Sequence, residues 1–94
     1  MTKAKLIIKT RRTRPNGGFV ELSVYEVPAP LRGSLHLYKY RLAFVVDGVC
    51  VMRYDNEAGK GDHKHIGENE TAIVFVDLPT LIRDFLADVE RIEQ

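Results

Sequence analysis

Cysteine, long apolar runs and net charge are all scarce in this 94-residue sequence. Cys50 is the one cysteine, so an intramolecular disulfide is excluded and a reducing compartment fits. No run approaches the roughly 20 apolar residues that cross a bilayer, and the first residues lack the apolar stretch of a signal peptide. We therefore expect a cytoplasmic protein with no membrane association, formed by a single domain over residues 1–94.

The formal net charge of +1 gives no overall attraction to nucleic acid. The charge is nevertheless uneven along the chain. Six cations and no acids lie between Lys3 and Arg14, whereas five acids and two arginines lie between Asp77 and Gln94. This asymmetry predicts two surfaces of opposite sign or, as a structural alternative, the solvated faces of one strand and one helix.

Alternating apolar residues and turn signals predict a small antiparallel sheet. The expected strands are residues 4–13, 19–27, 37–46, 49–54 and a short buried one at 71–76. Asn16-Gly17 and Asp47-Gly48 accept the positive φ of tight turns, so we expect two hairpins. The order of elements predicts an α+β fold, in which an antiparallel sheet of about five strands (two hairpins plus one strand) is covered on one face by a C-terminal helix.

The C-terminal helix is predicted by an apolar stripe at helical spacing. The stripe consists of Leu78, Leu81, Ile82, Phe85, Leu86, Val89 and Ile92. Asp77 is the expected N-cap, and Asp84, Asp88 and Glu90 are expected to face water. The other face of the sheet has no helix to cover it, so we expect it to be solvated or to bind a partner.

The hairpin around Asp47-Gly48 predicts which side chains meet at its open end. Stepping outward from a two-residue loop places Arg41 beside Tyr54 and Tyr40 close to Arg53. The cations of the sheet therefore join the segment that follows.

Residues 54–65 form the most polar stretch of the chain, with three carboxylates, two lysines, two histidines and two glycines. Gly59, Gly61 and Gly67 predict an irregular loop over residues 55–70. A loop of this length in so small a domain is uncommon and is usually functional or disordered. A functional site is therefore expected here.

The residues of this stretch allow four interpretations. Asp62, His63 and His65 carry donors that suit Zn²⁺ and other first-row ions, although Lys60 and Lys64 would repel a cation. The Gly-Lys-Gly run suits an anion such as an RNA phosphate but lacks the P-loop spacing. The two histidines suit metal-free acid–base cleavage of RNA. The same charges would also make a salt-bridged loop without a function.

Three runs of the sequence resemble the TumE-type toxins of bacterial toxin–antitoxin pairs. They are Tyr40–Gly48, Arg53–Glu57 and Gly59–His65, in which Tyr-Asp-Asn-Glu and Gly-Lys-Gly-Asp-His-Lys-His are the distinctive parts. The resemblance extends from the first hairpin to the terminal helix. It implies a small cytoplasmic toxin, encoded beside a cognate antitoxin with a helix-turn-helix domain, and by analogy with other small toxins it implies an RNA target.

We therefore expect the toxin of a type II toxin–antitoxin system, acting as a metal-independent ribonuclease without a cofactor. The expected catalytic residues are His63, His65, Asp62 and Lys60; the expected phosphate- and RNA-binding residues are Arg41, Arg53, Tyr54, Lys64 and Lys39; and Asp55, Asn56, Glu57, Gly59 and Gly61 are expected to shape the motif. One alternative is a non-catalytic protein- or nucleic-acid-binding module, whose open sheet face would bind an antitoxin or a second copy. The other is a metal-dependent hydrolase that uses the two histidines.

Overall fold

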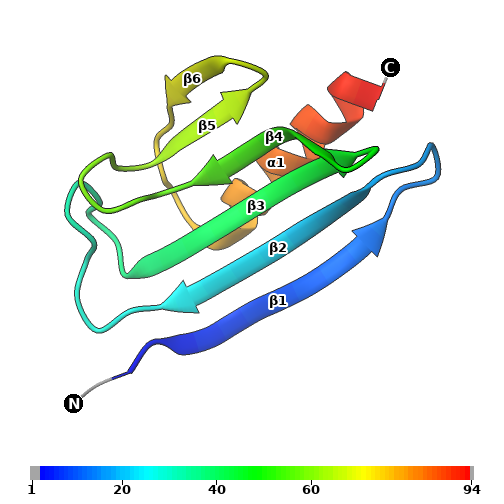
Figure 1. Cartoon of the computed structure of the whole chain (residues 1–94). Helices are drawn as coiled ribbons and strands as arrows, with labels where there is room; N and C mark the ends of the chain where they lie inside the picture. Colours follow the sequence, from blue (N-terminus) through cyan, green and yellow to red (C-terminus); the bar gives the residue numbers. More distant parts are fainter. Residues whose placement is uncertain (1–2, 94) are drawn as a thin grey trace.

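The structure, a computed structural model, describes residues 3–93 as one antiparallel sheet with one helix (Figure 1). The strands are β1 (Lys5–Thr13), β2 (Phe19–Glu26), β3 (Tyr38–Val46), β4 (Val49–Asp55), β5 (His63–Ile66) and β6 (Asn69–Ala72), and the helix is α1 (Leu78–Glu93). Each strand pairs with the next one along the chain. The α+β class and the single helical layer are confirmed, with one strand more than expected. No helix of residues 3–93 is long and apolar enough to cross a membrane.

Both hairpins predicted from turn residues are present. The turn between β3 and β4 uses positive φ angles at Asp47 (51°) and Gly48 (77°), which match the twist of the flanking strands. Val46 pairs with Val49 across it, as a two-residue loop requires. Local turn chemistry therefore sets the ends of these strands.

A β-bulge interrupts the pairing of β3 with β4 close to that turn. Beyond the bulge Arg41 pairs with Asp55, so the expected pairing of Arg41 with Tyr54 is wrong, and Tyr40 and Arg53 point to opposite faces. Side chains alternate along a strand, so a shift of one residue moves the rest of β4 to the opposite faces. The bulge therefore decides which side of the sheet carries the polar motif.

The expected loop over residues 55–70 is wrong in its second half, where β5 and β6 form a third hairpin. The His63–Ile66 strand pairs with the edge of β4, and Gly67 at φ 60° turns the chain into β6. The strand expected at 71–76 ends at Ala72 instead, and β6 is exposed rather than buried. His-Lys-His-Ile has little strand preference of its own, so its conformation comes from pairing with β4.

The core lies between α1 and the face of the sheet that α1 covers (Figure 1). Its buried apolar side chains are Val20, Val24, Tyr40, Leu42, Phe44, Met52, Tyr54, Leu81, Phe85 and Val89. Asp77 caps α1 as expected, because its Oδ1 accepts the Thr80 N–H at 2.8 Å. We call the other side of the sheet, away from α1, the open face.

Candidate functional site

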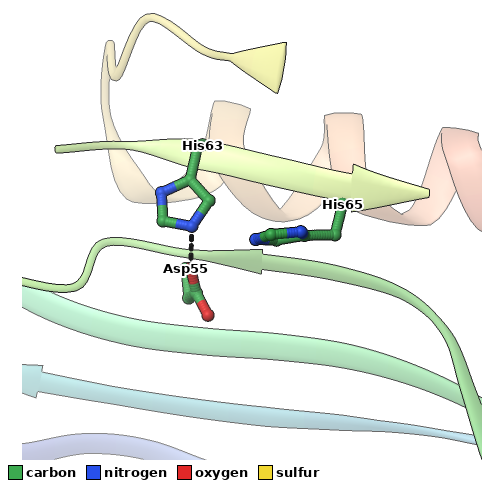
Figure 2. A group of neighbouring side chains, drawn as sticks. All are labelled: Asp55, His63 and His65. Atoms are coloured by element: carbon green, nitrogen blue, oxygen red, sulfur yellow. Dashed lines mark ion pairs between the residues drawn. The ribbon is translucent and has the colours of Figure 1, made fainter. Parts of the chain in front are cut away.

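Three side chains from neighbouring strands meet on the open face, between β4 and β5 (Figure 2). Asp55 pairs with His63 across the two strands, and partners across a sheet share a face. Tyr54, the neighbour of Asp55, packs against Phe85 of α1, so Asp55 points away from the helix. His63 and His65 are two residues apart in a strand and therefore point the same way.

The three side chains form a compact cluster that we call the Asp–His–His centre. His63 Nε2 lies 2.7 Å from Asp55 Oδ1. The ring centroids of His63 and His65 are 4.9 Å apart, with the rings at 75°. His63 is 3% exposed and Asp55 6%, whereas the His65 side chain is 23% exposed. The centre is therefore buried at Asp55 and His63 and reaches solvent at His65.

Two hydrogen bonds from groups outside the centre orient the His63 ring and the Asp55 carboxylate. His63 Nδ1 lies 2.9 Å from the carbonyl oxygen of Gly61. A carbonyl only accepts, so Nδ1 carries a proton and donates it in this bond. Arg53 Nε donates to Asp55 Oδ2 at 2.7 Å, which leaves Oδ1 facing the histidine. The ring and the carboxylate are thus held in place from behind, as the ligands of metal sites commonly are.

Glu70 lies at the rim of the centre, although nothing in the sequence pointed to it. It is the cross-strand partner of His65 in β6. Its Oε1 lies 3.7 Å from His63 Nε2 and 3.9 Å from His65 Nε2. Lys60, an expected catalytic residue, has its Nζ 3.9 Å from the same oxygen and so lies further out. Recognising the β5–β6 hairpin would have placed Glu70 beside the histidines.

A depression next to the centre holds the cations expected to bind phosphate. Lys39, Arg41 and Arg53 line it together with Asp55 and Glu57. Arg41 is exposed and lies opposite Asp55 in the sheet register. The structure therefore brings these three cations to the same part of the open face.

Two rows of cross-strand partners connect the centre to the basic first strand. One row is Lys9, Ser23, Arg41, Asp55, His63 and Ala72; the next is Arg11, Glu21, Ala43, Arg53, His65 and Glu70. At about 4.8 Å between strands, the row from Lys9 to His63 spans about 19 Å. The open face thus carries a band of cations that ends at the Asp–His–His centre.

Asp62 does not join His63 and His65. Its carboxylate accepts hydrogen bonds from Ser34 Oγ at 2.9 Å and from the Tyr40 hydroxyl at 2.8 Å, and it lies 2.7 Å from His36 Nε2. Burial and the bond to Asp62 raise the pKa of Tyr40, which keeps its hydroxyl a donor. All partners of Asp62 come from the protein, so this cluster ties two loops together.

Tyr54 and Lys64, expected to contact RNA, lie on the helix side of the sheet. The Tyr54 hydroxyl donates to the carboxylate of Asp88 in α1, and Lys64 Nζ lies 3.0 Å from the same oxygen. Arg91 pairs with the other carboxylate oxygen. Asp88 was expected to face water, but it is 3% exposed, so that expectation is wrong. Three partners compensate the buried charge, and the cluster fastens β4 and β5 to the helix.

The remaining motif residues shape the backbone around the site. The buried side chain of Asn56 accepts the Tyr40 N–H at 3.0 Å and donates to the Tyr38 carbonyl at 2.7 Å. Gly61 lies against Gly33 so closely that a Cβ there would come within 2.8 Å of the Gly33 oxygen. Gly59 N–H donates to the Arg32 carbonyl at 2.6 Å, and Glu57 is exposed. These contacts hold the segment that presents His63.

A family model described as Toxin TumE matches residues 2–93, which is nearly the whole chain. No curated protein and no solved structure matches the sequence. The chain therefore belongs to the TumE toxin family.

Proposed function

We propose that this member of the TumE toxin family is the toxin of a toxin–antitoxin pair and cleaves RNA phosphodiester bonds at the Asp–His–His centre. The observation that supports the proposal is the row of partners from Lys9 through Arg41 to Asp55 and His63. It joins a buried centre of ionisable groups to a cationic surface. Such a surface suits a polyanionic chain whose phosphate reaches the centre.

Phosphate would be bound by cations that form no ion pair within the described residues. Among residues 3–93, Lys9, Lys39 and Arg41 have no carboxylate within 4.0 Å, whereas Arg11 pairs with Glu21 at 2.6 Å. Arg41 is adjacent to Asp55 across the strands, so it would contact the phosphate next to the reacting one. Arg53 is tied to Asp55 and would orient that carboxylate. Binding through these cations would weaken as salt concentration rises.

Cleavage requires removal of a proton from the attacking oxygen, charge compensation at phosphorus and protonation of the leaving 5′-oxygen. In the metal-free form expected from the sequence, His63 and His65 would exchange these protons, and Asp55 rather than Asp62 would orient His63. In that form His63 would act through Nε2, since its Nδ1–H already binds the Gly61 carbonyl and Nε2 faces Asp55 Oδ1 at 2.7 Å. A cation bound between His63 Nε2 and Asp55 Oδ1 would provide a partner for both atoms.

The partner that we propose is a cognate antitoxin with a helix-turn-helix domain. The open face has no helix over it within residues 3–93, so a partner or a second copy can cover it. An antitoxin bound there would block the row of cations and the centre together. A non-catalytic module that uses the same face for binding is the second candidate function, because β6 leaves an unpaired strand edge beside the centre.

The test is incubation of the pure protein with a single-stranded RNA that carries labels at both ends. We expect cleavage, and we expect Asp55→Asn and His65→Ala to lower the rate at least about 100-fold, the usual contribution of an acid–base group. His36→Ala is the matched control, because His36 also lies 2.7 Å from an aspartate but outside the centre.

Circular dichroism is used to correct each rate for the folded fraction. Retention of full activity by Asp55→Asn and His65→Ala would contradict the site. An absence of RNA cleavage at any protein excess, combined with RNA or antitoxin binding, would instead support the non-catalytic module.

A further inference from the structure

We propose that Asp55 Oδ1, His63 Nε2 and His65 Nε2 together bind one divalent first-row transition-metal ion. The role of this ion in RNA cleavage rests on the proposed function, but its binding does not. One carboxylate and two imidazoles contribute these atoms, and the three residues bring a donor atom each within 4.8 Å of the other two. This donor set is known from metal sites that bind zinc or non-haem iron.

The three atoms are buried and have no hydrogen-bond partner within the described residues 3–93. His63 Nε2 and Asp55 Oδ1 are 2.7 Å apart, but they are not aligned as a hydrogen bond. Buried polar atoms nearly always have a partner, so three orphan atoms that converge on one point need an explanation. A ligand of opposite charge at that point would provide it.

The hydrogen bond of His63 Nδ1 leaves the other ring nitrogen to face Asp55. The Nδ1–H donates to Gly61, so in the neutral ring Nε2 carries a lone pair that faces a carboxylate oxygen. A metal ion accounts for all three atoms together.

The groups around the three atoms match those of established metal sites. Ligating histidines commonly donate their other N–H to a carbonyl, as His63 does to Gly61, and ligating carboxylates are themselves hydrogen-bonded, as Asp55 is to Arg53. Ligands at about 2.1 Å from a tetrahedral ion lie about 3.4 Å apart. To reach that spacing, His63 Nε2 and Asp55 Oδ1 would have to separate from their present 2.7 Å, and the partly exposed His65 side chain would have to move toward them.

The charges near the centre do not oppose a cation as the sequence suggested. Lys64 was expected to repel it, but Lys64 lies on the other face and pairs with Asp88. Lys60 approaches Glu70 at 3.9 Å, while Arg53 is paired with Asp55. Arg41, opposite Asp55 in register, and Lys39 remain unpaired among residues 3–93, and both lie on the surface that we assign to RNA.

Three protein ligands leave coordination positions open, as in catalytic rather than structural sites. Glu70 Oε1 lies 3.7–3.9 Å from the two histidine nitrogens, at the rim of the centre. The open coordination positions would lie on this side. Glu70 would therefore accept a proton from a water molecule on the ion or complete the coordination. Imidazole ligands favour Zn²⁺, Mn²⁺, Fe²⁺ or Co²⁺ over Mg²⁺ and Ca²⁺, which prefer all-oxygen sites.

The experiment is a binding titration of the full chain after chelator treatment and dialysis. Zn²⁺, Mn²⁺ and Co²⁺ are added separately, and the heat of binding, the melting temperature and the visible absorption of Co²⁺ are recorded. We expect one ion per chain, a higher melting temperature on binding and at least about 100-fold weaker binding by His65→Gln, which removes one of the three ligands. His65 forms no hydrogen bond that its loss would break, so the variant is expected to fold.

His36→Gln is the matched control, because it also alters a histidine that faces an aspartate, and it should bind the ion as tightly as the parent protein. Absence of binding at millimolar metal would overturn the proposal, as would equal affinities of the parent and His65→Gln. RNA cleavage is measured in the same samples with and without EDTA. Cleavage that persists in EDTA would refute a role of the ion in cleavage and keep the ribonuclease, whereas metal binding without cleavage would keep the metal site and refute the ribonuclease.

Discussion

Replacement of Tyr54 by phenylalanine tests whether residues 54–65 serve the site only from the open face, with Tyr54 on the helix side contributing stability alone. Tyr54 is 3% exposed, and its ring meets Phe85 edge-on at 5.4 Å between centroids. Its hydroxyl donates to the buried carboxylate of Asp88. Burial, and to a lesser degree the charge of Asp84, raise the pKa of Tyr54, so the hydroxyl keeps its proton at neutral pH. Tyr54→Phe removes this donor and leaves the ring.

The expected loss in the free energy of unfolding depends on the partners that Asp88 retains in the variant. A hydrogen bond to a charged group contributes about 1.5–3 kcal/mol. Lys64 and Arg91 still pair with the carboxylate, so the free energy of unfolding should fall by an amount near the lower end, about 1.5–2 kcal/mol. For a domain of this size, that loss lowers the melting temperature by about 6–16 °C.

The assay is urea unfolding of the parent protein and the variant, with RNA cleavage measured at a temperature where both are folded. Tyr25→Phe is the control, because the Tyr25 hydroxyl forms no hydrogen bond within the described chain and its loss should change stability by less than about 0.5 kcal/mol. We expect Tyr54→Phe to cleave RNA like the parent. Lost cleavage at unchanged stability would refute this role, because Tyr54 would then act in the chemistry.

Two further predictions concern stability. Gly61→Ala places a Cβ 2.8 Å from the Gly33 oxygen at φ +75° and should cost more than about 1 kcal/mol in urea unfolding, more than Gly48→Ala, whose Cβ at φ +77° meets nothing within 4 Å; equal losses would contradict the close approach. The hydrogen bond from Arg14 lowers the pKa of Glu93 below its usual value of 4.5, so this pair stabilises the fold fully above that pH and loses its effect as the pH falls through the lowered pKa. Glu93→Gln should therefore flatten the acid side of the stability–pH curve, and identical curves would refute the contribution.

The parts of the fold that were predicted correctly depend on residues close in the sequence. The Asp47-Gly48 turn fixes its own φ angles, and the apolar stripe of α1 fixes the face that the helix buries. The β5–β6 hairpin was missed because His63–Ile66 becomes a strand by pairing with β4, a partner that its own composition does not reveal. The bulge in β4 was missed for a similar reason, since no turn residue marks it.

The Asp–His–His centre lies within the polar stretch 54–65, but the carboxylate that faces His63 is Asp55 rather than Asp62. Asp62 is adjacent to His63 in the chain, yet it points toward Ser34 and Tyr40. Asp55 is eight positions from His63 and faces it across two strands. Contact across a sheet depends on register, which the sequence leaves ambiguous wherever a bulge can slip the pairing by one residue.

The alternation of the strands links the stability of the fold to the geometry of the centre. Asp55 follows Tyr54, and Lys64 separates the two histidines, so each residue of the centre has a chain neighbour on the opposite face. Tyr54 and Lys64 both reach Asp88, which therefore fixes the register of β4 against β5 from the helix side. A slip of one residue in β5 would turn both histidines toward the core and separate them from Asp55. The buried charge at Asp88 thus selects the one register in which the carboxylate and both imidazoles converge.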